Sequence, residues 1–145
     1  MSYVKIWVHL VFATKNREYH LPIELGHAIH EHIISNCIKK EIFLQAIGGS
    51  VDHVHCLISL GKDQAIAQVV QSIKGESSFW INKNHILSYK FSWQDDYFAV
   101  SVSESLVGIV MKYIKNQEEH HRFRSFPEEA AEFISKYGFK LIHDE

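Results

Sequence analysis

The sequence has few cysteines and prolines, and it lacks a long hydrophobic run. Of its 145 residues, two are cysteine and two are proline. Two cysteines are too few for a disulfide framework, so we expect a reducing, cytoplasmic setting. No stretch reaches the roughly 20 apolar residues that a membrane-spanning helix needs. The N-terminus also lacks the basic and apolar regions of a signal peptide. These absences argue against a secreted disulfide scaffold and predict a protein without a membrane span.

A strong excess of positive charge is also missing. The formal net charge is −2, whereas a basic excess is usual in nucleic-acid-binding domains. The sequence does have 46% hydrophobic and 12% aromatic residues, which is typical of a folded globule and not of a disordered chain. At this length we expect one domain over residues 1–145, large enough to bury a core.

Hydrophobic periodicity predicts alternating strands and helices. Alternation of apolar and polar residues predicts strands at residues 3–14, 41–48, 51–60 and 96–102. Helical spacing predicts helices at residues 23–40, 64–83 and 104–121. We expect Gly48-Gly49-Ser50 to turn the chain, Ser103 to cap the third helix, and a last helix to begin near Pro127. The order β-α-β-β-α-β, followed by two helices, predicts an α+β, ferredoxin-like fold with an antiparallel sheet.

This arrangement makes two predictions about the sheet. The first and third strands should be central, and the two crossover helices should cover one face. In the strand at residues 3–14, Ile6, Leu10 and Phe12 belong to the apolar side. The opposite face of the sheet would then be open for a site or a partner.

Two histidines lie in the apolar segment VDHVHCLISL, at residues 51–60. Alternate residues of a strand face opposite sides, so His53 and His55 share one face. The other face is the core face, formed by Val54, Cys56, Ile58 and Leu60. The two histidines should lie about 7 Å apart at the backbone, within reach of one metal ion. This short pattern is equally compatible with a polar pair on a half-exposed strand.

The helix at residues 104–121 offers further candidate residues. Tyr113 and Gln117 are four residues apart, so they are neighbours on the helix surface. They continue a stripe that includes Val110 and Ile114. A tyrosine at the end of such a stripe often packs in a core and satisfies its hydroxyl locally, and the spacing alone leaves that interpretation open.

Several segments together carry a resemblance to a known family. HVHCLISL looks like the HUH signature of single-strand DNA nickases, in which two histidines flank a hydrophobic residue. HLVFATKNR, WQDDYFAVSVS and YIKNQEEHH resemble segments of the single-tyrosine transposases of small insertion sequences that move as single-stranded DNA. The likeness covers about residues 3–126 and implies the same ferredoxin-like core. Carried over by position, it implies that His53, His55 and Gln117 bind a divalent metal and that Tyr113 is the nucleophile.

The resemblance also implies a reaction and its partners. Attack by Tyr113 on single-stranded DNA would give a 5′-phosphotyrosine and a free 3′-hydroxyl, and a second 3′-hydroxyl could rejoin the DNA. We expect Mg²⁺ or Mn²⁺ as the metal. The implied substrate is a hairpin end of an insertion element. The implied assembly is a homodimer in which the tyrosine helix of one chain docks on the histidine strand of the other. Periodicity leaves packing on its own sheet open.

Contacts with DNA require cationic and aromatic side chains. The candidate cations are Lys15, Arg17, Lys74, Lys83, Lys90, Arg122 and Arg124. Trp80 and Trp93 are candidate surfaces for base stacking. For each of these residues, a solvated surface charge or a core aromatic is the alternative.

Three other functions deserve comparison. A domesticated, repetitive-element-associated tyrosine transposase would have the same active site and a different DNA specificity. A non-catalytic ferredoxin-like module that binds single-stranded nucleic acid would not need Tyr113 and Gln117, whose presence argues against it. A phosphoesterase with two His-x-Ser/Thr motifs does not fit, because Cys56 follows His55 and no second motif of this type is present.

Overall fold

A four-stranded antiparallel sheet organises the molecule. The computed structural model describes residues 1–15 and 21–117, and the strand order is β2-β3-β1-β4. The elements are β1 (Ile6–Ala13), α1 (Ile23–Lys39), β2 (Phe43–Gly49), β3 (His53–Leu60), α2 (Ile66–Lys83), β4 (Phe98–Val102), the 3-10 turn η2 (Glu104–Leu106) and α3 (Val107–Lys115). The predicted α+β class and β-α-β-β-α-β order are confirmed, with β1 and β3 in the centre of the sheet.

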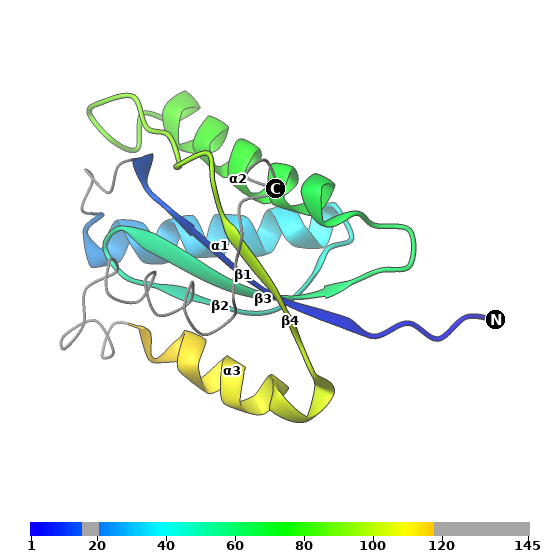
Figure 1. Ribbon diagram of the computed structural model, residues 1–145. Helices are drawn as coiled ribbons and strands as arrows, with labels where there is room; N and C mark the ends of the chain where they lie inside the picture. Colours follow the sequence, from blue (N-terminus) through cyan, green and yellow to red (C-terminus); the bar gives the residue numbers. More distant parts are fainter. Residues whose placement is uncertain (16–20, 118–145) are drawn as a thin grey trace, which may run out of the picture.

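Helices α1 and α2 cover one face of the sheet, as predicted (Figure 1). The sheet contributes Leu10, Cys56 and Ile58 to this core, and all three are fully buried. The helices contribute a matching set of apolar side chains, among them Ile29, Ile33, Val70 and Ile73. The face that alternation assigned to the interior of β3 is therefore the face that packs against the two crossover helices.

The opposite face is covered by α3 of the same chain (Figure 1). Trp7, Ala46 and Leu57 of the sheet pack there against Ile114 of α3, and all four are buried. The expectation of an open face was therefore wrong for the described chain. Because β4 continues through η2 directly into α3, the apolar side of the helix folds back onto the adjacent sheet.

A glycine allows α3 to lie unusually close to the sheet. Gly48 of β2 pairs with His55 of β3. A Cβ atom built on Gly48 would lie 2.1 Å from the carbonyl oxygen of Ile114, far inside van der Waals contact. Only a residue without a side chain lets the backbone of α3 approach β2 in this way. The position of α3 over the histidine strand therefore depends on Gly48.

Several predicted boundaries differ from the structure. β2 continues through Gly49, which pairs with Val54, so the turn begins at Ser50, two residues later than in the predicted Gly48-Gly49-Ser50 turn. Ser103 does precede the helical segment, but its hydroxyl lies 3.3 Å from that of Ser105 and makes no capping bond to the backbone. The helix expected near Pro127 lies outside the described residues. None of the described helices is long and apolar enough to cross a membrane.

We expect Gly48→Ala to lower the free energy of unfolding by about 1–3 kcal/mol, because the new methyl group overlaps the Ile114 carbonyl. Urea denaturation measures the change. Gly26→Ala is the matched control, since a Cβ at that position of α1 meets nothing within 4 Å. Alanine is the better helix former, so the control should gain up to about 1 kcal/mol. Equal stability of Gly48→Ala and the wild type would contradict the close packing of α3 on β2.

Candidate active site

Three histidines form a buried cluster under α3. His53 and His55 lie on the side of β3 opposite Cys56, as alternation predicted, and point toward this helix; they are 1% and 0% exposed. His9 of β1 joins them at 5% exposure. Its Nε2 lies 2.9 Å from Nδ1 of His55, and the two rings are 5.1 Å apart between centroids. The predicted histidine pair is therefore part of a set of three imidazoles on one sheet face.

Both ring nitrogens of His53 lie at hydrogen-bond distance from a neighbouring side chain. Its Nδ1 lies 2.9 Å from a carboxylate oxygen of Asp52, and its Nε2 lies 3.1 Å from Oε1 of Gln117. Gln117 is 1% exposed, and its amide nitrogen donates to the carbonyl of Tyr113 at 3.3 Å. The structure therefore brings together the strand histidine and the helix glutamine that the resemblance had paired.

Tyr113 lies over the same cluster. Its ring meets the ring of His55 edge-to-face, with centroids 5.6 Å apart, and that of His9 at 6.2 Å. It also packs beside Val11 and Phe98 and is half-buried. Tyr113 and Gln117 are thus on the side of α3 that faces the histidines, as their spacing had predicted.

The donor set fits a divalent metal ion. When Nδ1–H of His53 donates a hydrogen bond to Asp52, Nε2 of His53 and Oε1 of Gln117 present lone pairs to each other at 3.1 Å. Neighbouring ligands of an ion with bonds of about 2.1 Å lie about 3 Å apart, so a shared cation would satisfy both atoms. The described residues contain no group of three or more His, Cys, Asp or Glu side chains arranged around a metal. The candidate set therefore depends on the amide of Gln117.

The cysteines do not contribute to this site. Cys56 lies between the histidines and the end of β3, but it points into the opposite core and is fully buried. Burial raises the pKa of its thiol well above the usual value. Burial, and secondarily the charge of Glu76, raises the pKa of Cys37 to about 11. Both thiols are therefore protonated near neutral pH and are poor nucleophiles.

Sequence reasoning missed two members of the cluster. Asp52 directly precedes His53 and was visible as a neighbouring carboxylate. His9 of β1 was not among the predicted site residues. The predicted topology was the signal that could have pointed to His9, since two adjacent central strands bring residues of the same sheet face together. The register that aligns Val11 with His55, and hence His9 diagonally across from it, became visible only in the paired sheet.

The candidate DNA contacts are distributed over different parts of the molecule. Lys15 is exposed just beyond Ala13, which pairs with His53, so it lies at the histidine end of β1. Lys83 is exposed, with its ammonium 5.6 Å from the ring centroid of Phe79, and Lys90 is exposed as well. Three further candidates lie outside the described residues: Arg17, Arg122 and Arg124.

The two candidate stacking tryptophans are engaged within the protein. Trp93 is 5% exposed, packs edge-to-face with Phe12 at 4.8 Å, and donates its indole N–H to Ser77 at 2.9 Å. It is a core residue, so its predicted role as a stacking surface is wrong. Trp80 is half-buried and stacks on His32, with ring centroids 4.1 Å apart.

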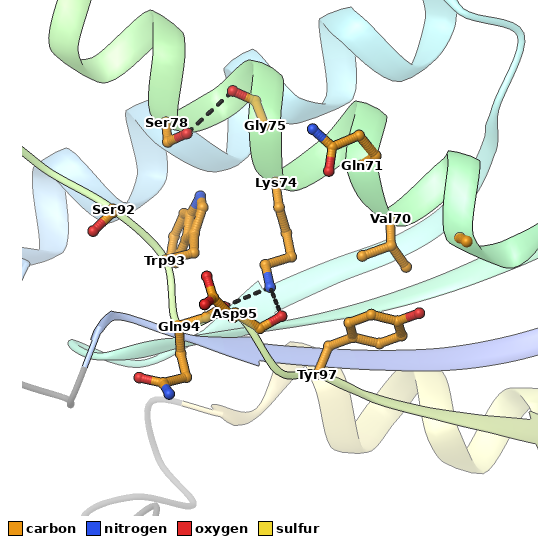
Figure 2. Close-up of a pocket in the computed structure, with 11 residues that line it drawn as sticks. Val70, Gln71, Lys74, Gly75, Ser78, Ser92, Trp93, Gln94, Asp95 and Tyr97 are labelled. Atoms are coloured by element: carbon orange, nitrogen blue, oxygen red, sulfur yellow. Dashed lines mark hydrogen bonds between the residues drawn. The ribbon is translucent and has the colours of Figure 1, made fainter. Parts of the chain in front are cut away.

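Lys74 binds the segment that leads into β4. Figure 2 shows its side chain reaching from α2 toward residues 94–97, beside a pocket of about 370 Å³. Its ammonium donates to the backbone carbonyls of Gln94, Asp95 and Asp96 at 2.5, 2.9 and 3.4 Å. Burial lowers the pKa of Lys74, although the charges of Asp95 and Asp96 act in the opposite direction. The ammonium thus anchors the segment that leads into β4.

We expect Lys74→Met to lower the free energy of unfolding by about 1–3 kcal/mol, because it leaves backbone carbonyls without a charged donor. Lys83→Met, at an exposed position, is the matched control and should change it by less than about 0.5 kcal/mol. Urea denaturation compares the two variants. Unchanged stability together with a weaker salt dependence of DNA affinity would instead assign Lys74 to phosphate binding.

Comparisons with solved structures agree with this fold. A protein from Deinococcus radiodurans R1, assigned to the transposases, superimposes with a TM-score of 0.65 at 26% identity, over 81% of this chain and 95% of that one. A REP-associated tyrosine transposase bound to a REP hairpin superimposes with a TM-score of 0.58, over 79% of this chain and 67% of that one. At 18% identity, this second likeness concerns the fold alone.

The sequence comparison identifies the family. The search of curated proteins found no match. The family model described as "Transposase IS200 like" matches residues 2–117, which is well over half of the chain and includes the histidine strand and the tyrosine helix. The chain therefore belongs to the IS200-like transposase family.

Proposed function

We propose that this transposase cleaves and rejoins single-stranded DNA with Tyr113 as the nucleophile and a divalent metal ion held by His53, His55 and Gln117. One observation carries the proposal. Oε1 of Gln117 lies 3.1 Å from Nε2 of His53, while the ring of Tyr113, one helical turn earlier, lies on the ring of His55. The proposed nucleophile and the atoms proposed to bind the metal ion thus share one buried sheet face.

The chemistry balances as a transesterification. The hydroxyl oxygen of Tyr113 forms a bond to phosphorus, and the bond from phosphorus to the 3′-oxygen of the preceding nucleotide breaks. The phenolic proton is lost and the leaving 3′-oxygen gains a proton, so the products are a 5′-phosphotyrosine and a 3′-hydroxyl. The phosphodiester energy is retained in the covalent bond, and a 3′-hydroxyl from another DNA end can reverse the step. This logic suits cutting and rejoining better than hydrolysis.

The surroundings of Tyr113 support its role. A phenol with a pKa near 10 is mostly protonated at neutral pH and needs help to attack. A bound Mg²⁺ or Mn²⁺ would supply that help by withdrawing charge from the scissile phosphate. The protein itself orients the phenol ring through His55 and His9 and shields the histidine side chains beneath it from water.

The DNA partner is proposed to be the hairpin end of an insertion element. The fold is shared with a REP-associated tyrosine transposase whose structure is bound to a REP hairpin, which makes the domesticated type of transposase the second candidate. The exposed Lys15 at the histidine end of β1 is the described cation best placed to meet a phosphate near the site. That the protein forms a homodimer stays a prediction. In the structure the Tyr113 helix packs on its own sheet, so we propose a site built within one chain in place of one shared between two chains.

The test is covalent capture of DNA by Tyr113. Single-stranded hairpins copied from the DNA flanking the coding sequence are labelled at either end and incubated with the protein and Mn²⁺. Attack in the proposed direction leaves the 3′-labelled fragment on the protein in a denaturing gel and releases the 5′-labelled fragment. Tyr113→Phe should abolish the adduct with little change in hairpin affinity, because only a hydroxyl is lost.

Tyr89→Phe is the matched control, since Tyr89 is exposed in the segment between α2 and β4. It should form the adduct as the wild type does. Persistence of the adduct in Tyr113→Phe would remove Tyr113 from the nucleophile role. Retention of the 5′-labelled fragment on the protein would reverse the proposed polarity.

A further inference from the structure

We propose that His9 is a positioning residue that fixes the tautomer of His55, so that Nε2 of His55 carries the lone pair needed to bind the metal ion. The inference rests on the proposed function for the identity of the metal ligands. It adds a third histidine, from a different strand, to the residues on which the site depends.

The geometry joins His9 to one particular nitrogen of His55. Nε2 of His9 lies 2.9 Å from Nδ1 of His55, which is hydrogen-bond distance, and both side chains are buried. Two neutral imidazoles can share such a contact only if one nitrogen carries a proton and the other a lone pair. Because Nδ1 of His55 is engaged with His9, the nitrogen that remains for a metal ion is Nε2.

The direction of this hydrogen bond follows from the chemistry. A nitrogen that binds a metal ion carries no proton, so the proton of a neutral His55 must sit on Nδ1. Nδ1 of His55 therefore donates, and Nε2 of His9 accepts. The opposite direction, with His9 donating, would leave the proton of His55 on Nε2 and prevent metal binding there.

His53 provides an internal comparison. Its Nδ1 faces the carboxylate of Asp52 at 2.9 Å, the usual arrangement in which an outer acceptor orients a metal-binding histidine. His9 supplies the same hydrogen bond to His55 without a negative charge. A second carboxylate beneath Tyr113 would repel the phosphate that this site must admit, and a neutral imidazole avoids that repulsion. The two histidines are thus oriented by different acceptors.

The direct test is the tautomer of His55 in the wild-type protein. In protein with ¹⁵N-labelled histidine side chains, long-range ¹H–¹⁵N spectra report which ring nitrogen carries the proton. The metal-free protein should show His55 protonated on Nδ1. A proton on Nε2 of His55 would overturn the proposal, and this measurement needs no variant to fold.

A second test measures Mn²⁺ affinity by calorimetry. His9→Leu should weaken binding about 10–100-fold, the usual cost of losing an outer partner of a metal ligand. The Mn²⁺ affinity of His9→Gln should stay within a few-fold of that of the wild type, because the glutamine amide oxygen can accept the hydrogen bond from Nδ1–H of His55. His32→Leu is the matched control, since His32 bonds Glu76 between α1 and α2, on the opposite face of the sheet. It should leave the affinity unchanged.

The outcomes separate this inference from the proposed function. Unchanged affinity in a folded His9→Leu variant would overturn the role of His9. Equal losses in His9→Leu and His9→Gln would also overturn it, because a general packing defect does not depend on an acceptor atom. If the wild type binds no Mn²⁺, the proposed metal chemistry fails. The measured tautomer of His55 would then still show whether Nδ1 of His55 donates its hydrogen bond to His9.

Discussion

The close packing of α3 on the second face of the sheet is the contact on which the candidate site depends. The backbone of α3 can reach β2 because Gly48 has no side chain under the Ile114 carbonyl. Ile114 is fully buried there against Trp7 and Leu57. Tyr113 and Gln117 flank Ile114 along the chain, so the contact that buries Ile114 also fixes their height above the histidines. The same packing therefore contributes to stability and assembles the site.

The site itself is a chain of polar contacts enclosed by apolar side chains. Asp52 holds His53, His53 meets Gln117, and His9 meets His55. Burying polar groups is costly unless they are paired, which explains why each histidine is engaged by a neighbour. Enclosure also strengthens electrostatic interactions inside the cluster, because water screens them less.

The sequence was sufficient for the fold and for the side on which each histidine lies. Alternation within residues 51–60 correctly separated His53 and His55 from the core residue Cys56, because a strand has a period of two. Spacing likewise placed Tyr113 and Gln117 on one side of a helix. The side of a strand or helix on which a residue lies is a local property, so it can be predicted from a single sequence.

Contacts between distant segments were not predictable in the same way. His9 was missed because its partner is determined by the register of β1 against β3, which alternation does not specify. Trp93 looked like a surface for DNA bases, but its neighbours Phe12 and Ser77 come from other elements. The prediction of an open sheet face was wrong for a similar reason, since the close approach at Gly48 involves residues of β2 and α3, which are far apart in the sequence. The residues singled out by resemblance lie together in the structure, and their roles stay a proposal.

The central claim is that α3 and the histidine strand of one chain form a single metal-binding site. Anomalous diffraction from crystals of the protein grown with MnCl₂ tests it most directly. We expect one strong manganese peak about 2.2 Å from Nε2 of His53 and from Oε1 of Gln117 in the same chain, with His55 as the third protein ligand. A peak elsewhere, or one whose glutamine comes from a second chain, would contradict a metal site built within one chain.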